Sequence, residues 1–197
     1  MSTADANPTR PIAEDRLVWI DLEMTGLIVE TDVVVEIAVL VTDSDLNILD
    51  PEGFDQVIHQ PDEVLANLND VVRTMHTKSG LLKEIAASTI AEPDAFADAL
   101  AYIQRFVPAA RSAPLCGNTI GMDRRFLARY APAIDDYLHY RNVDVSSIKE
   151  LCRRWYPEVY KGRPGKSESH RALDDIRESI AELAYYRSEL FVSANSD

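Results

Sequence analysis

Basic residues are scarce in this chain of 197 residues, which has 20 lysines and arginines against 33 aspartates and glutamates. The formal net charge at pH 7 is −13. Proteins that coat long nucleic acids derive their affinity from clustered lysine and arginine side chains that neutralise phosphates. The charge balance therefore argues against a general coating role. It still allows a short anionic substrate that is held by a few local basic residues and a metal ion.

Long apolar runs and paired cysteines are also absent. No apolar run approaches the roughly 20 residues that span a bilayer, and the first 14 residues contain no apolar segment typical of a signal peptide. Cys116 and Cys152 have neither a redox nor a metal-binding spacing, so we interpret both as small buried side chains. These absences predict a cytoplasmic protein with no membrane partner.

One folded domain fits the length and composition of the chain. With 46% hydrophobic and 27% charged residues, a chain of this size can bury a core without disulfides. The polar ends show no hydrophobic periodicity. We therefore predict a flexible N-terminal tail over residues 1–14, a single domain over 15–192 and a flexible C-terminal tail over 193–197.

Strands come first in the predicted order of elements, and strands then alternate with helices. We predict strands from 17 to a break at Gly26, then at 33–42, 48–49, 55–59, 115–117 and 140–145. We predict helices over 61–72, 80–87, from 93 onward, over 121–130, from a capping box at Ser147 and Glu150 to about Trp155, and over 170–190. This order predicts an α/β fold with a mixed sheet.

Two acids share one face of the first predicted strand. Side chains alternate between the faces of a strand, so Asp21 and Glu23 project from the same side. Two buried anions side by side cost several kcal/mol unless a proton or cation neutralises them, so this pair predicts a divalent metal site. The same spacing recurs at Asp50 and Glu52, but a neighbouring proline and glycine place that copy in a solvated turn.

Two later segments carry further candidate residues. Asp123 falls in the first turn of a predicted helix, where a carboxylate can complement the helix dipole or bind a cation. His170 precedes Asp174 and Asp175, which combines a titratable base with ligating oxygens. Helix geometry alone pairs His170 with Asp174, because positions five apart diverge by about 140°. On these grounds the choice between the two acids stays open.

Taken together, these residues resemble the motif set of the DEDDh 3′-to-5′ exonucleases, which have a ribonuclease H-like fold. The set is Asp21-x-Glu23, Asp123 and His170-x-Ala172-x-x-Asp175. Longer runs over about residues 17–191 resemble the oligoribonuclease family: 19–27, 116–118, 123–127, 139–141, 144–146 and 175–179. The resemblance implies a mixed five-stranded sheet flanked by helices.

The same resemblance implies a metal-dependent 3′-to-5′ exoribonuclease, a hydrolase of phosphodiester bonds. Asp21, Glu23, Asp123 and Asp175 would hold two Mg²⁺ or Mn²⁺ ions, because these hard cations prefer carboxylate oxygens. Of the two acids that follow His170, the resemblance thereby selects Asp175 as the ligand. With a reference pKa of about 6.5, His170 would take the proton of the attacking water. The products would be 5′-mononucleotides.

The resemblance further implies a homodimer that degrades very short RNA, especially dinucleotides, by capping the 5′ phosphate. The implied substrate contacts are Leu27 between the bases, His76 beside the substrate, and Thr119, Tyr140, Arg141 and Ser146 around the phosphate, with Tyr140 reaching in from the partner subunit. Thr119 stands where the family commonly has serine, and it keeps the hydroxyl. Arginine suits this role because its donors form a fork that matches phosphate oxygens.

The chain departs from the family in one stretch. Many members have a stacking tryptophan in the part that matches residues 67–76, and this chain has none there. Its tryptophans, Trp19 and Trp155, are predicted to lie in the core. Stacking then depends on Leu27 and on either Met75 or a valine, so base preference can differ from that of other members, because one stacked base contributes about 1–3 kcal/mol.

Three other functions compete with this interpretation. A DEDDh exonuclease acting on DNA would use the same four acids and histidine. A phosphatase with Asp21 as nucleophile more usually has a second aspartate where Glu23 stands. A non-catalytic nucleic-acid or scaffold protein would not need the complete set of acids and histidine. The substrate contacts therefore favour the exoribonuclease.

Overall fold

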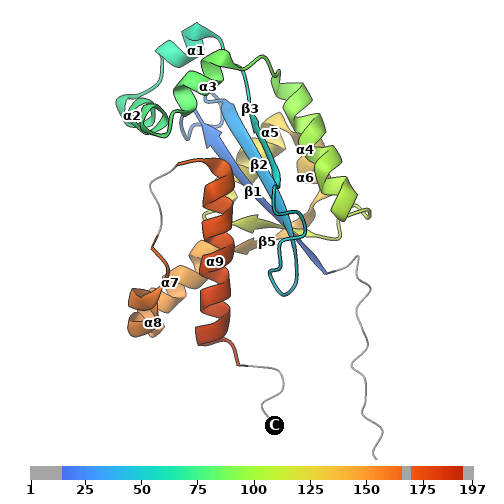
Figure 1. The fold of residues 1–197 in the computed structure, drawn as a ribbon, viewed down its shortest axis with the longest axis vertical. Coiled ribbons are helices and arrows are strands. Elements are labelled where there is room, and N and C mark those ends of the chain that lie inside the picture. Colours follow the sequence, from blue (N-terminus) through green and yellow to red (C-terminus); the bar gives the residue numbers. More distant parts are fainter. Residues whose placement is uncertain (1–14, 166–169, 193–197) are drawn as a thin grey trace, which may run out of the picture.

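A computed structural model describes residues 15–165 and 170–192 of the chain (Figure 1). The strands are β1 Arg16–Met24, β2 Val34–Asp43, β3 Phe54–Val57, β4 Pro114–Gly117 and β5 His139–Asp144. The helices are α1 Asp62–Ala66, α2 Asp70–Ser79, α3 Leu81–Ala87, α4 Glu92–Phe106, α5 Gly121–Tyr130, α6 Pro132–Tyr137, α7 Val145–Trp155, α8 Pro157–Gly162 and α9 Ala172–Leu190. The predicted tails, 1–14 and 193–197, lie outside the described residues. Within the described residues, every helix is too short or too polar to cross a membrane.

The strands form one mixed sheet in the order β3-β2-β1-β4-β5. β1 pairs antiparallel with β2, which pairs antiparallel with β3, whereas β4 runs parallel to both β1 and β5. The first three strands thus form an antiparallel meander, and the last two are reached through helices. This arrangement confirms the predicted α/β fold with a mixed five-stranded sheet flanked by helices.

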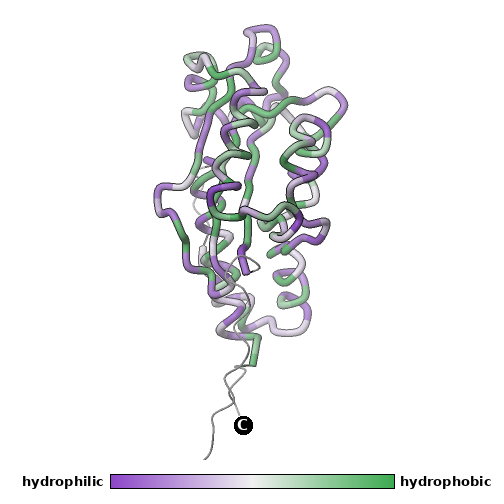
Figure 2. Tube along the Cα trace, turned by 90° about the vertical axis from the view of Figure 1, so that its right-hand side faces the viewer, coloured by the Kyte–Doolittle hydropathy of each residue, from purple (hydrophilic) through white to green (hydrophobic). Residues whose placement is uncertain are grey.

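Alternation along β1 divides the core into two layers. Val18, Ile20 and Leu22 pack in one cluster with buried residues of α4, α5 and α6. Trp19 packs on the opposite face in a second cluster, with buried residues of α7 and α9. Figure 1 shows α4 on one side of the sheet and α9 on the other, and Figure 2 shows hydrophobic stretches running through the interior. Both acids of β1 therefore lie on the α9 side of the sheet, because they share the face of Trp19.

Several predicted elements were wrong in detail. The helix predicted over 61–72 is two helices, because Asn69 accepts a hydrogen bond from the Val72 amide at 2.9 Å and caps α2. The capping box at Ser147 does not start α7. Asp144 is its N-cap and accepts from the Ser146 amide at 2.9 Å. The sequence reasoning also missed α6, which begins at Pro132, and α8.

The two tryptophans have opposite environments. Trp19 is fully buried, as predicted, and its indole N–H donates to the Thr42 hydroxyl at 3.1 Å. Trp155 is 65% exposed at the end of α7, so its prediction as a core residue was wrong. Both cysteines are buried and free, as predicted.

Candidate active site

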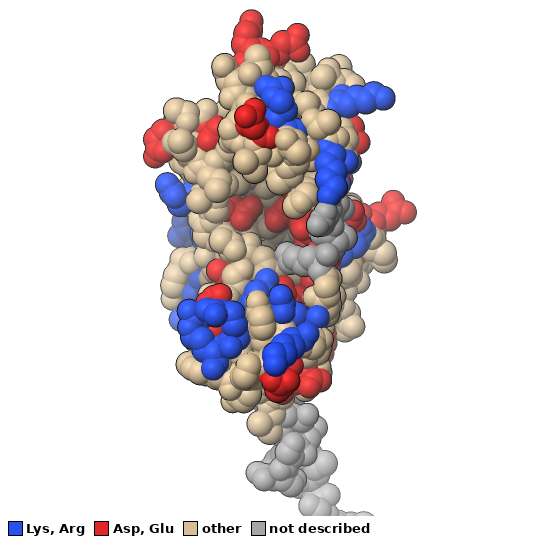
Figure 3. Space-filling model, turned by 90° about the vertical axis from the view of Figure 1, so that its left-hand side faces the viewer, with Lys and Arg blue, Asp and Glu red and all other residues tan. Residues whose placement is uncertain are grey.

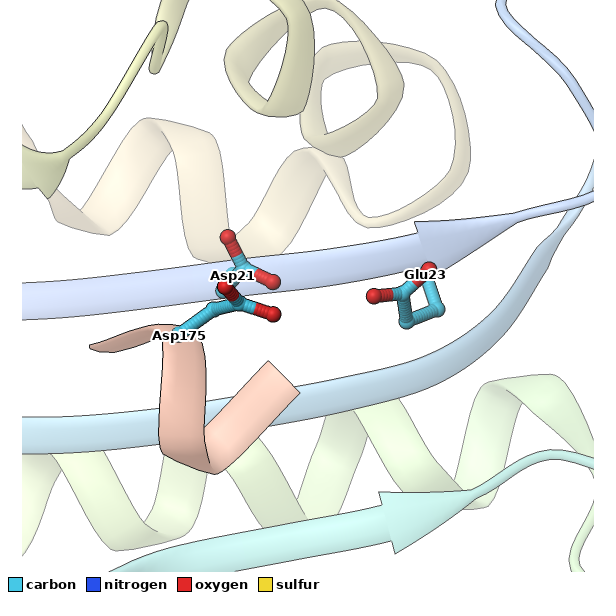
Figure 4. A group of neighbouring side chains, drawn as sticks. All are labelled: Asp21, Glu23 and Asp175. Atoms are coloured by element: carbon cyan, nitrogen blue, oxygen red, sulfur yellow. The ribbon is translucent and has the colours of Figure 1, made fainter. Parts of the chain in front are cut away.

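Three carboxylates from two elements form the centre of the candidate site. Asp21 and Glu23 come from β1 and Asp175 from the first turn of α9, and one oxygen of each lies within 4.8 Å of the others. In Figure 4 the side chains of Asp21 and Asp175 meet, and that of Glu23 lies farther along β1. Strand alternation explains the first pair, and the packing of α9 on that face of the sheet adds the third acid.

Negative charge is poorly compensated around Glu23. Its side chain is buried, and burial together with the charges of Glu36, Asp175 and Asp123 raises its pKa to about 8. A divalent cation fits such a set, because carboxylate oxygens are hard ligands and a positive ion removes their mutual repulsion. Figure 3 shows acidic side chains inside a hollow across the middle of one face, with lysine and arginine side chains gathered below it.

Asp123 lies beside this cluster, outside the group of three. It is buried in the first turn of α5, and its Oδ1 accepts a hydrogen bond from the Leu22 amide at 3.1 Å. Burial raises the pKa of Asp123 to about 7. The Asp123 carboxylate is therefore hydrogen-bonded to the backbone of β1 between the two acids of that strand. Its charge is one of those that raise the pKa of Glu23.

The residue at which α9 begins determines which of the two acids that follow His170 faces the site. The helix begins at Ala172, so His170 precedes it, with a left-handed φ of 47°. The rule that pairs helical positions four apart therefore does not apply. Asp174 is more than half exposed and lies 4.0 Å from Arg177, whereas Asp175 belongs to the three-acid group. The fold thus brings Asp175, and not Asp174, to the acids of β1, and its role as a metal ligand stays a prediction.

A tight loop follows β1 and presents Leu27. The Asp32 carboxylate accepts hydrogen bonds from the Thr25 hydroxyl at 3.1 Å and the Ile28 amide at 2.7 Å. A Cβ on Gly26 would lie 2.5 Å from an oxygen of Asp32, so a larger residue there would push this carboxylate away from its hydrogen bonds. Leu27 is consequently held 65% exposed at the end of the strand that carries the acids.

His76 lies beneath the cluster. Its ring is fully buried, and Nε2 donates to the Met24 carbonyl at 2.9 Å. Nδ1 lies 3.9 Å from a carboxylate oxygen of Glu23 and has no hydrogen-bond partner among the residues that the structure describes. Burial lowers the pKa of His76, so the neutral ring faces Glu23. In this structure His76 adjoins a candidate ligand, and a direct substrate contact stays a prediction.

The predicted phosphate-binding residues lie at two places along β5: Thr119 and Ser146 contact its last residue, Asp144, whereas Tyr140 and Arg141 lie near its start. The hydroxyls of Thr119 and Ser146 are 3.0 Å apart, and the backbone amides of both residues donate to Asp144 Oδ1. Tyr140 is 73% exposed on the edge strand, and the Arg141 guanidinium lies 5.2 Å from the centre of its ring. The two predicted hydroxyls are therefore adjacent, and the exposed Tyr140 is accessible to a second subunit.

Two residues near the site were missed by the sequence reasoning. Glu36 is fully buried on β2 and is paired with Arg171, which stands between His170 and α9. A signal was available for Glu36, because it is the only charged residue in the apolar strand predicted over 33–42. Its partner is 135 positions away in the chain, so no local pattern identifies it.

Comparison with known proteins connects this geometry to a family. A family model described as an exonuclease, RNase_T, matches residues 18–183. The chain is 59% identical to an oligoribonuclease of Leifsonia xyli over 92% of its own length and 86% of the relative's. It is 60% identical to an oligoribonuclease of Streptomyces avermitilis over 90% of this chain and 88% of that one. The chain belongs to the oligoribonuclease family of exonucleases.

Solved structures agree with this family at the level of the fold. An E. coli exonuclease I in complex with a dA16 oligonucleotide superimposes with a TM-score of 0.68 at 16% identity, over 89% of this chain. The exonuclease I from Methylocaldum szegediense gives a TM-score of 0.62 at 18% identity. This chain spans 41% of the length of each of these longer proteins. Membership of the oligoribonuclease family thus agrees with the ribonuclease H-like sheet.

Proposed function

We propose that this protein is a 3′-to-5′ exoribonuclease that degrades very short oligoribonucleotides, especially dinucleotides, to 5′-mononucleotides. The observation that carries the proposal is the group of Asp21, Glu23 and Asp175, in a chain about 60% identical to proteins named oligoribonuclease. Acting on short RNA also agrees with the net charge of −13, which does not suit a long polyanion. A cytoplasmic location remains our prediction from the sequence.

The acids would hold two Mg²⁺ or Mn²⁺ ions. Asp21, Glu23 and Asp175 offer converging oxygens, and Asp123 adds a fourth carboxylate beside them. When bound, such ions neutralise phosphate charge, lower the pKa of water and stabilise the leaving 3′ oxygen. The raised pKa of Glu23 supports this assignment, since burial and the neighbouring acids outweigh the compensation that Arg171 provides.

The remaining residues would orient and cleave the substrate. His170 would accept the proton of the water that attacks the terminal phosphodiester. Leu27 would separate the two bases at the end of β1, where it is exposed. The adjacent hydroxyls of Thr119 and Ser146 would bind the 5′ phosphate together with Arg141.

The decisive experiment is product analysis on 5′-labelled RNAs of two to about twenty residues, with and without EDTA. We expect dinucleotides to be converted to 5′-mononucleotides faster than longer strands are shortened, because the 5′ phosphate cap leaves room for two residues. EDTA should abolish this activity, because the carboxylates alone cannot supply the chemistry of a cation. Full activity in EDTA, or faster shortening of the long strands, would contradict the proposal.

We also propose a homodimer formed through the surface of α7 and β5. Leu151 and Trp155 lie one turn apart on α7, Tyr156 follows them, and all three are exposed. Large apolar side chains grouped on a surface are typical of protein interfaces. The exposed Tyr140 on the edge strand would then reach the partner's site.

A charge at Trp155 should separate the subunits. We expect Trp155→Glu to be monomeric in light scattering and to lose at least about tenfold in dinucleotide turnover, because a buried unpaired charge opposes association. Val192→Glu is the matched control, since it places the same charge at an exposed apolar position near the C-terminal end of α9. A Trp155→Glu protein that stays dimeric would exclude this interface.

A further inference from the structure

Arg171 joins three separate parts of the chain next to the candidate site. Its guanidinium donates to Glu36 Oε1 from Nε at 2.9 Å and from Nη2 at 2.7 Å. It also donates to both carboxylate oxygens of Glu84, from Nη1 at 3.0 Å and from Nη2 at 2.9 Å. The side chain thereby connects the start of α9 to β2 and to α3. Such bidentate pairs fix geometry as well as contributing energy.

Glu36 supplies a second connection to the same helix. It lies directly opposite Glu23 in the pairing of β1 with β2, and its side chain is fully buried. Its Oε2 accepts from the Ala172 amide at 3.3 Å, whereas the N-cap residue of α9, Arg171, has no capping bond from its own side chain. A carboxylate of β2 therefore takes the place of a local cap on the helix that carries Asp175.

Arg171 also lies between the two site residues that come from this segment. His170, immediately before it, has φ of 47°, a conformation that costs a non-glycine residue about 1 kcal/mol or more. Such strain persists where surrounding contacts determine the conformation. The carbonyl of Arg171 accepts from the Asp175 amide at 3.0 Å, so its backbone holds the first turn of α9.

We propose that Arg171 is a positioning residue: its ion pairs with Glu36 and Glu84 fix the start of α9 and so set His170 and Asp175 against Asp21 and Glu23. This inference rests on the proposed function. Arg171 itself touches no substrate in this scheme. It acts through its two neighbours, so its loss should impair the chemical step more than the binding of RNA.

The primary test is Arg171→Met, which keeps a long side chain and removes the ion pairs. We expect kcat for a diribonucleotide to fall by about 10²-fold while KM stays within about threefold of wild type, because misplacement near 1 Å costs that much. In the metal-free protein, backbone amides of residues 172–176 should exchange hydrogen faster. Arg171→Lys should recover only part of kcat, since lysine lacks the planar fork of donors.

Two further variants keep the test decisive if Arg171→Met does not fold. Glu84→Gln alters a half-exposed partner and weakens one arm of the network, so we expect a folded protein whose kcat falls about threefold to tenfold. Arg187→Met is the matched control. Arg171 is the N-cap of α9, and Arg187 lies within the helix near its other end, where it pairs with Asp45 at 2.5 Å. Its loss should leave kcat unchanged.

The outcomes separate the two proposals. A wild-type protein that does not cleave dinucleotides would refute the proposed function, while amide exchange would still report on the network around Arg171. An active wild type with unchanged kcat in Arg171→Met and Glu84→Gln would refute the positioning role alone. So would a loss of kcat that Arg187→Met reproduces, or one that occurs without faster exchange at residues 172–176.

Discussion

Asp175→Asn should reduce diribonucleotide turnover by about 10³-fold or more, whereas Asp174→Asn should leave it within about twofold of wild type. The two acids are consecutive in α9, yet only Asp175 lies within 4.8 Å of the oxygens of Asp21 and Glu23. Asparagine keeps the size of the side chain but provides one neutral oxygen. Turnover should therefore fall through weaker cation binding and a less stabilised transition state.

The measurement is steady-state hydrolysis of a diribonucleotide across a range of Mn²⁺ concentrations, together with calorimetric titration of the metal-free protein with Mn²⁺. Asp175→Asn should show weaker Mn²⁺ binding, and Asp174→Asn should bind the ion as the wild type does. Equal losses of turnover in both variants would mean that activity depends on the negative charge at the start of α9 and not on ligation of a cation by Asp175. A larger loss of turnover in Asp174→Asn would indicate that Asp174 acts together with His170, as helix geometry alone suggests.

Much of the fold and part of the site follow from local sequence patterns. Alternation in β1 predicts that Asp21 and Glu23 share the face of Trp19, and the structure has this arrangement. The helix over Gly121–Tyr130 has the predicted bounds, because it begins at a glycine and a proline soon follows its end. These features depend on neighbours a few positions apart, which is the range that periodicity describes.

Features that depend on distant partners were not predictable from these patterns. Helical periodicity gave no reason to prefer Asp175 over Asp174, since the choice depends on where α9 begins relative to β1. The network of Arg171 with Glu36 and Glu84 joins segments that are far apart in the chain. The exposure of Trp155 was not predictable for a similar reason. An apolar residue on the solvent-exposed face of a helix has the same sequence pattern as one that faces the core.

Glu23→Gln should stabilise the metal-free protein at pH 8 while it abolishes activity. Burial and neighbouring acids raise the pKa of Glu23 from an ordinary 4.5 to about 8. At pH values between 4.5 and about 8, Glu23 is protonated in the native state and ionised in the unfolded state. The free energy of unfolding of the wild type should therefore fall as pH rises through this window. The loss is on the order of a few kcal/mol, at about 1.4 kcal/mol per pKa unit.

Glutamine removes the titration, so the stability of Glu23→Gln should depend less on pH. Some dependence should remain, because burial also raises the pKa of Asp123 to about 7. Urea unfolding in EDTA at pH 5.5 and 8 tests this, with Glu52→Gln as the control because it changes an exposed carboxylate in a turn. Mn²⁺ should stabilise the wild type more at pH 8 than at pH 5.5, because the cation replaces the proton on Glu23. If the metal-free stability of the wild type rises between these pH values, Glu23 is ionised and its charge is compensated by the protein itself. The argument for a cation at this site would then lose its electrostatic basis.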